Sequence, residues 1–353
     1  MTVYIAAAGF CSALGADLHS SWLAYQAGIS GYQQSSFATK FNQNALIAGV
    51  PESLIRATLP GCEAMQEVSS TVDRRAKILN YAFEDLISQT GLDVELPAYL
   101  LQHELEQGLD NIELDSFKEI VDGLVMPIDP ERLLPIPLGR ASFAEAVLQF
   151  ERSDLVNALV VATHDPLDFD WLERLDREDR LKAAGVMDGF APGECGVVIL
   201  LTKEAERAKK FSPNPLSIHS IEIAKGTGRD SHTLPIDSST LYTCERRSLE
   251  ADSERLIHSV FSSHNGESYW NRSMSLSGIR LNSKFVEDYP TIYPAEYLGD
   301  TACSAGAVCV LWAALHLKSR VSSAASPSEH ALIQLQSDNG WCASAILSSL
   351  SPS

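Results

Sequence analysis

Basic residues are scarce in this chain of 353 residues. Lys and Arg number 27 against 46 Asp and Glu, which gives a net charge of −19. Proteins that bind nucleic-acid backbones or anionic membranes present clusters of basic side chains to the phosphates. The composition therefore argues against nucleic acid and membrane as partners, and an acidic acyl carrier protein would need a local basic patch in order to dock.

The chain also lacks a basic N-terminal segment. No Lys or Arg precedes Lys40, so the apolar first 14 residues do not have the charged start of a secretory signal peptide. The apolar run at 305–317 is shorter than the about 20 residues that cross a bilayer, and it contains His316. We therefore expect a cytoplasmic protein.

Paired cysteine motifs are absent as well. The seven cysteines are scattered, and none forms a Cys-x-x-Cys pair. This spacing argues against a disulfide framework and a zinc site, and it favours reduced, mostly buried thiols. No metal and no cofactor is expected.

Strand and helix patterns alternate along the first half of the chain. The segments 158–162 and 197–201 are apolar at every position, which is typical of strands covered on both faces. A helical pattern around Trp171 lies between them. This order predicts an α/β fold with a largely parallel sheet and helices on both faces.

The second half shows the same kinds of pattern. The apolar alternation changes parity between Ile218 and Ile221, which predicts a bulged strand. The segment 249–261 has apolar residues on one side of a helical wheel and predicts a helix, and 331–335 with 343–347 predicts a closing strand pair. Prolines at 213 and 215 mark the predicted boundary between two halves, 1–212 and 213–353.

Two motifs carry a resemblance to a known family. Asp188-Gly-Phe-Ala-Pro-Gly-Glu194 resembles the signature that closes the first half of β-ketoacyl synthases, which are members of the thiolase superfamily. Leu298-Gly-Asp-Thr-Ala-Cys-Ser-Ala-Gly306 is similar to the Gly-His-Thr segment of these enzymes that enters a buried helix. The resemblance implies a thiolase-like duplicated fold of α-β-α-β-α layers, with two pseudo-symmetric halves and a dimer formed through the first half.

The family's catalytic residues are not matched. The resemblance implies a cysteine thiolate at a helix N-terminus and two histidines that stabilise an enolate. The nucleophile position falls at or near Pro137, where no cysteine stands, and Asp300 replaces the second histidine. An ionised carboxylate would repel an enolate. His264 matches the first histidine by position, but the Asn265-Gly266 turn beside it favours a role in that turn.

Two side chains are weak candidates for a replacement nucleophile. Ser142 fits better as a hydroxyl at the start of a helix, and Cys303 fits better as a buried packing thiol. If the two halves superpose, Arg140 and Asp300 face the same former cavity, and we expect them to form an ion pair there. The predicted site is thus a vestige made of Pro137, Arg140, His264 and Asp300, with no catalytic residue expected.

Three functional hypotheses follow. The first is a catalytically inactive adaptor, chaperone or scaffold, similar to thiolase-like accessory proteins associated with type VI secretion effectors, which have similar Gly-Asp-Thr and Asn-Gly-Glu segments. The second is a chain-length-factor-like subunit that pairs with an active ketosynthase. The third is an atypical acyltransferase that uses His264 with Cys303 or Ser142. The first two predict a protein partner, in a homodimer or a heterodimer.

Overall fold

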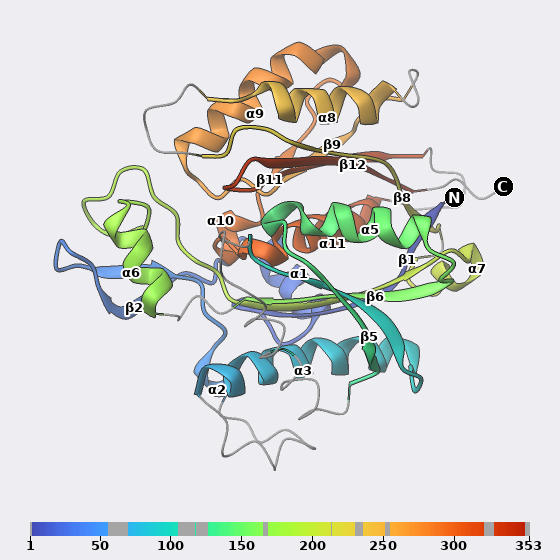
Figure 1. The fold of residues 1–353 in the computed structure, drawn as a ribbon, viewed down its shortest axis with the longest axis horizontal. Coiled ribbons are helices and arrows are strands. Elements are labelled where there is room, and N and C mark those ends of the chain that lie inside the picture. The colour runs from blue at the N-terminus through green and yellow to red at the C-terminus, as the bar shows by residue number, and fades with distance from the viewer. Residues whose placement is uncertain are drawn as a thin grey trace.

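Five layers of secondary structure build the protein. The computed structural model describes residues 2–55, 70–104, 117, 126–164, 169–212, 214–229, 236–250, 255–320 and 328–349. Helices cover both outer faces, two sheet layers lie inside them, and a further layer of helices lies between the sheets (Figure 1). This arrangement confirms the predicted α-β-α-β-α order.

Ten strands of the described chain are hydrogen-bonded in the order β10-β9-β11-β12-β8-β1-β7-β6-β4-β5. They are β1 (Val3–Ser12), β4 (Leu96–Leu101), β5 (Ile128–Ile136), β6 (Asn157–His164), β7 (Cys195–Thr202), β8 (Leu216–Lys225), β9 (Ser259–Ser262), β10 (Thr291–Ile292), β11 (His330–Gln336) and β12 (Trp341–Ser349). β1 pairs with β7 along most of its length but with β8 only through Val3 and Tyr4. That narrow joint lets the two parts of the sheet separate into two layers.

The sheet is mixed, so the prediction of a largely parallel sheet is wrong. β7 is antiparallel to both β1 and β6, and β12 is antiparallel to both β8 and β11. The chain between β6 and β7 returns at the end of the sheet where His164 faces Cys195. A connection that stays at one end must bring the next strand back antiparallel.

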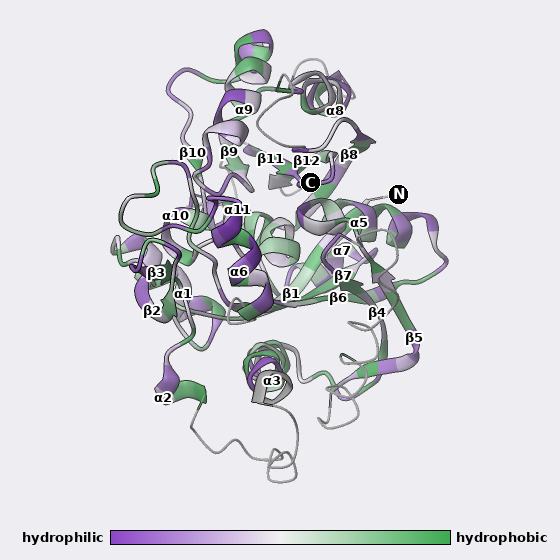
Figure 2. Cartoon of the chain, turned by 60° about the vertical axis from the view of Figure 1, so that its left-hand side comes forward, coloured by the Kyte–Doolittle hydropathy of each residue, from purple (hydrophilic) through white to green (hydrophobic). Residues whose placement is uncertain are grey.

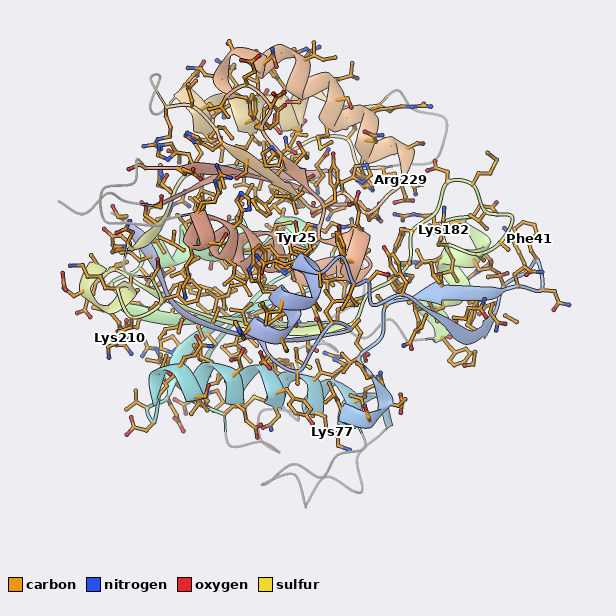
Figure 3. The ribbon with its side chains drawn as sticks, turned by 180° about the vertical axis from the view of Figure 1, so that it is seen from behind. Tyr25, Phe41, Lys77, Lys182, Lys210 and Arg229 are labelled. Carbon is orange, nitrogen blue, oxygen red and sulfur yellow. The ribbon has the colours of Figure 1, made fainter. Side chains whose placement is uncertain are left out.

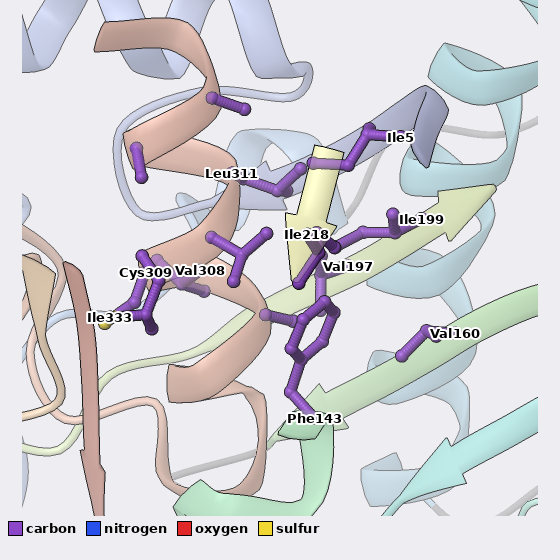
Figure 4. Close-up of a cluster of buried hydrophobic side chains, with 14 of the residues drawn as sticks. Ile5, Phe143, Val160, Val197, Ile199, Ile218, Val308, Cys309, Leu311 and Ile333 are labelled. Carbon is purple, nitrogen blue, oxygen red and sulfur yellow. The ribbon is translucent and has the colours of Figure 1, made fainter. Parts of the chain in front are cut away.

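The two central helices are α5 (Ser142–Arg152) and α11 (Ala305–Arg320). Phe143 on α5 and Val308 and Leu311 on α11 pack with strand residues of both layers (Figure 4). The stretch Ala302–Arg320 is apolar and long enough to cross a membrane by length and composition alone, but 78% of it is buried inside the protein. It is the core helix of the fold.

The outer layers consist of amphipathic helices. α3 (Ser70–Thr90) covers β1 and β7 with Ile78, Ala82 and Leu86, which are fully buried. α8 (Ser239–Glu250) and α9 (Ser268–Leu281) cover the other sheet layer. Hydrophobic residues gather on the inner strands, whereas α6 is largely hydrophilic (Figure 2).

A small lobe projects from this body. It consists of β2 (Gln33–Ala38), β3 (Asn44–Ile47) and α6 (Phe169–Arg177), and it has its own apolar cluster. Phe41 lies at its tip (Figure 3). The shorter elements are α1 (Leu18–Gln26), α2 (Glu52–Ile55), η2 (Gly139–Ala141), α7 (Ala205–Ala208), η3 (Asn282–Lys284), α10 (Ala295–Leu298) and η4 (Ala302–Ser304).

Two expectations for the second half had different outcomes. The bulge in β8 is confirmed, because His219 pairs with Ile346 and Glu222 with Ser344, so two residues of β8 face one of β12. The helix over 249–261 is wrong. α8 ends at Glu250, and Val260 and Phe261 lie in the buried strand β9. A short apolar run does not distinguish a buried strand from a helix by its period.

Candidate functional site

The two sequence motifs meet in space and support each other. The Gly193 N–H donates to the Asp300 carbonyl at 2.8 Å, and the Asp300 N–H donates to the Ala191 carbonyl at 2.8 Å. A Cβ atom on residue 193 would lie 1.9 Å from the Leu298 carbonyl oxygen, so only glycine fits there. The first motif therefore holds the backbone of Asp300 in place.

The acidic residues of the first motif also have structural partners. Asp188 caps the N-terminus of α9, accepting from the Ser268 N–H at 2.7 Å and the Ser268 hydroxyl at 2.6 Å. Glu194 is fully buried and accepts from Arg74 Nη2 and from the Val50 N–H, both at 2.7 Å. The motif thus ties together elements from both halves of the chain.

The predicted pair between Arg140 and Asp300 is present. Arg140 lies in η2 just before α5, and Asp300 lies just before η4 and α11, so the pair joins the starts of the two central helices. Arg140 Nε lies 3.3 Å from Asp300 Oδ1, and Nη2 donates to Oδ2. Both residues are buried, at 6% and 2% exposure.

This pair is one part of a larger network that is buried except at Asp338, whose side chain is 35% exposed. Asp338, in the turn between β11 and β12, accepts from Arg140 Nη1 at 2.8 Å and from Arg180 Nη1 at 2.6 Å. Arg180 also donates through Nε and Nη2 to the two carboxylate oxygens of Glu267, each at 2.8 Å. Bidentate contacts of this kind are the strongest geometry for an arginine and a carboxylate.

The buried carboxylates have further donors. Asn265 Nδ2 donates to Asp300 at 2.8 Å, and the Ala302 N–H donates to Asp300 Oδ1 at 2.9 Å. Glu267 accepts from Trp270 Nε1 at 3.1 Å and pairs with Arg229 Nη2 at 2.9 Å. Opposite charges and hydrogen bonds on all sides are what make buried ions tolerable.

Arg140 and Asp338 are held in their charged forms by their partners. Burial would lower the pKa of Arg140, but Asp300 and Asp338 outweigh it, so the pKa is raised well above its usual value. Burial would raise the pKa of Asp338, but Arg140 and Arg180 outweigh it and hold the pKa well below the usual value. At neutral pH Arg140 and Asp338 therefore form a pair of opposite charges.

Glu104 covers the helix start where the resemblance places the nucleophile. Gly139 has a φ of +59°, and a Cβ atom there would lie 2.3 Å from the Glu104 carboxyl carbon. Glu104 Oε1 accepts from the Asp338 N–H at 3.0 Å, which fixes the carboxylate over this position. A thioester oxyanion placed here would meet a negative charge instead of open N–H donors.

A small pocket remains beside the network. Arg140, Arg180, Glu104, Asp338 and His103 contribute to its wall, and its volume is about 40 Å³. Pockets for cofactors and drug-sized ligands are on the order of 300–1,000 Å³. A pocket of this volume has room for only a few water molecules and is too small for an acyl chain.

The candidate replacement nucleophiles lie in structural positions. The Ser142 hydroxyl is fully buried, donates to the Ile136 carbonyl at 2.7 Å and accepts from the Leu138 N–H at 2.9 Å, so it ties down the loop that contains Pro137. Cys303 lies in η4 and is 2% exposed. Pro137 is half-buried between β5 and η2.

His264 lies in a tight turn. Its Nδ1 accepts from the Gly266 N–H at 2.8 Å, and its ring lies 5.1 Å from that of Tyr293. Burial lowers the pKa of His264. The direct contact with Asp300 comes from the neighbouring Asn265.

The buried thiols are held neutral. Burial raises the pKa of Cys195 and of Cys244 to about 12, and it raises the pKa values of Cys11, Cys309 and Cys342 further. A reactive cysteine needs the opposite shift. Within the described ranges, no three His, Cys, Asp or Glu side chains come together in a way that would hold a metal ion.

Sequence reasoning missed most of the network. Arg180, Asp338 and Glu104 come from separate segments, and no spacing in the sequence links them to each other or to the other members. The Asn265-Gly266-Glu267 turn was a partial signal, because it contains two members of the network. The other contacts depend on how the two halves meet.

Comparison with known proteins gave structural matches only. No protein-family model and no curated protein matches the sequence. The structure is similar to a ketosynthase from module 6 of the bacillaene synthase of Bacillus subtilis 168, with 12% identity and a TM-score of 0.75 over 100% of this chain and 73% of that one. It is also similar to a type II PKS ketosynthase, AntDE, solved with its acyl-carrier protein AntF (13%, TM-score 0.73, 99% of both chains).

A third similar structure is the ketosynthase ApeO in complex with its chain length factor ApeC from Xenorhabdus doucetiae. Its identity is 16% and its TM-score 0.69, over 99% of this chain and 98% of that one. Identities this low establish the architecture and leave the activity open. The chain has the thiolase-like fold shared by ketosynthases and chain length factors.

Proposed function

We propose that this chain is a non-condensing subunit that works by pairing with a second chain of the ketosynthase type. The observation that carries the proposal is the network of Arg140, Asp300 and Asp338 that occupies the place of a catalytic centre. It joins the starts of both central helices, where the fold would otherwise hold a nucleophile. A chain with this fold and a filled site fits an architectural role.

The similar structures support a partner of the same fold. One of them is described as a ketosynthase in complex with its chain length factor, and another as a ketosynthase and chain length factor for ishigamide. Both descriptions name a ketosynthase together with a chain length factor. The chain-length-factor-like hypothesis therefore has more support than the adaptor hypothesis.

The edge strand β5 offers a surface for such a partner. Among the described strands, β5 pairs only with β4, and Leu134 on β5 is 46% exposed. Unpaired edge strands present N–H and C=O groups that another strand can pair with. The Ile136 carbonyl faces β4, since it accepts from the Gln102 N–H at 3.1 Å, so the neighbouring Pro135 faces outward.

Pro135 favours a different partner over a second copy. Proline has no N–H, so it removes one outward donor from the edge. The edge also bulges away from β4 between Ile128 and Leu133, where Pro130 lies. If two copies paired through this edge, each strand would contribute a missing N–H donor and a bulge. A partner with a regular edge strand would contribute neither, so fewer hydrogen bonds would be lost, which favours a heterodimer.

The test is co-expression with the ketosynthase-like chains of the same genome, followed by native mass spectrometry. We expect a 1:1 complex with one cysteine-bearing chain. Leu134→Arg should weaken that complex at least tenfold, whereas Ile29→Arg, which alters an exposed residue near α1, should not.

Failure to form any complex with a ketosynthase, by a chain that is well folded, would refute the proposal. A stable complex with a protein of another fold would instead support the adaptor hypothesis, including a role with a type VI secretion effector. Turnover of an acyl thioester by this chain alone would support the acyltransferase hypothesis.

A further inference from the structure

The outer face of α9 carries apolar residues where a solvent-exposed helix normally carries polar ones. Ile279 is 76% exposed and Leu276 is 45% exposed. With Arg272 and Arg280 they recur at i, i+4, i+7 and i+8, which places all four on one face of the helix. We refer to these four residues as the α9 face.

The α9 face is positively charged in a strongly acidic protein. The chain has a net charge of −19, yet no Asp or Glu occurs between Glu267 and Glu287, whereas Arg272, Arg280 and Lys284 lie in that interval. Repulsion between like charges disfavours basic partners here, and acidic groups are attracted. Asp188 accepts from the first turn of α9 and offsets part of the Arg272 charge. Arg280 and Lys284 lie at the other end of the helix, so the face still combines apolar area with a local charge opposite to that of the whole molecule.

The helix is fixed in an orientation that presents this face. Trp270, Ser273, Ser277 and Leu281 point inward and are buried. The Ser277 hydroxyl donates to the buried Glu245 on α8, and the Ser273 hydroxyl accepts from Gln336 Nε2 at 2.9 Å. These contacts leave α9 little freedom to turn its apolar residues inward.

Arg280 is held in place as well. Its guanidinium lies 5.2 Å from the centre of the Tyr242 ring on α8, a cation–π contact. A guanidinium positioned in this way needs less ordering when it meets a carboxylate. The α9 face is thus a preformed arrangement of two aliphatic side chains flanked by two cations.

We propose that the α9 face binds an acidic amphipathic helix of another protein. Leu276 and Ile279 would pack against the apolar stripe of that helix, and Arg272 and Arg280 would pair with carboxylates that flank the stripe. Helix-on-helix docking of this type uses anchors at i, i+3, i+4 and i+7. The face lies on the outer layer above β11 and β12, away from the β5 edge (Figure 1), so it leaves that edge free.

The test uses a fluorescein-labelled helical peptide of about 18 residues, a length near that of α9, with leucines at helical spacing and glutamates on both flanks. A second peptide replaces every glutamate by lysine. Fluorescence anisotropy with the full chain measures binding of each at low and moderate salt. We expect saturable binding of the acidic peptide only, weakened by salt because the contacts are exposed.

Matched variants locate the site. Ile279→Ser and the double variant Arg272→Glu with Arg280→Glu should each weaken binding of the acidic peptide at least tenfold. Lys210→Glu, which makes one charge reversal beside α7 on another side of the molecule, should leave it unchanged. These positions are exposed, so circular dichroism should show all variants to be folded.

Two results would overturn the inference. One is the absence of saturable binding of the acidic peptide at low salt. The other is equal binding by the double arginine variant and the unmodified chain. Neither result bears on the β5 edge, so the inference and the pairing proposal fail separately.

Discussion

Replacing Asp300 by Asn tests the buried network most sharply. The substitution keeps the size of the side chain but removes its charge and turns an acceptor into an NH₂ group. Asp300 now accepts from Arg140, from Asn265 Nδ2 at 2.8 Å and from the Ala302 N–H at 2.9 Å. In the variant, Arg140 would lose its contact with a buried carboxylate and keep its hydrogen bond to the partly exposed Asp338.

The expected cost is large because both partners are buried. Breaking a buried ion pair from one side typically costs about 3–5 kcal/mol, since the remaining charge stays out of water. Urea unfolding followed by circular dichroism measures the loss. As a control, Arg247→Gln alters a pair with Glu222 that is 3.9 Å long and 56% exposed on the arginine side. Pairs like that contribute about 0–1 kcal/mol.

A double variant separates the pair from its surroundings. Arg140→Met combined with Asp300→Leu removes both charges at once and fills the space with apolar atoms. It should lose clearly less stability than the sum of the two single variants, because neither charge is left alone. A loss below about 1 kcal/mol for Asp300→Asn, or additive losses in the double variant, would refute the reasoning.

Further predictions concern ionisation and thiol chemistry. Burial raises the pKa of Glu245 from 4.5 to about 7. The contribution of this side chain to the free energy of unfolding is therefore complete below pH 4.5, and about 3 kcal/mol of it is lost as the pH rises through 7. In Glu245→Gln, the free energy of unfolding from urea curves should depend less on pH between pH 5 and pH 8. The pKa of Asp338 is held low, so its contribution is present above about pH 4 and is lost in acid; Asp338→Asn should be less acid-sensitive in melts from pH 5 to pH 3. Cys62 lies outside the described residues, so it is replaced by Ser for a labelling test. In that background, intact mass after maleimide treatment at neutral pH should show no label on the folded chain, because burial holds thiols such as Cys195 neutral.

A specific result would contradict each of these predictions. An unchanged slope of stability between pH 5 and pH 8 in Glu245→Gln would show that another group titrates there. Equal acid sensitivity of Asp338→Asn and the unmodified chain would remove Asp338 from the acid transition. Rapid labelling of one thiol in the folded chain would identify a reactive cysteine.

The sequence predicts the layers and the ion pair well. Continuous apolar residues at 197–201 indicated a strand covered on both faces, and β7 lies inside the sheet between β1 and β6, with every residue buried. The resemblance carried by Asp188 and Gly299 implied two superposable halves. From that symmetry alone, Arg140 and Asp300 were expected to meet, and they do.

Other features depend on packing that no local pattern encodes. The short apolar run around Phe261 is compatible with both a helix and a buried strand, so its structure was predicted wrongly. The direction of a strand depends on the end of the sheet at which its connection enters, as β7 shows by running antiparallel to β6. The partners Arg180, Glu104 and Asp338 become visible only once the two halves are docked, because their sequence separations follow no repeat.

The most direct test of the account is intact mass after exposure of the purified chain to acetyl, malonyl and longer acyl thioesters. The network of Arg140, Asp300 and Asp338 and the buried neutral thiols predict no acyl adduct on the folded protein. A stoichiometric adduct that one substitution abolishes, at Ser142, Cys303 or another cysteine, would contradict the account and identify a working nucleophile.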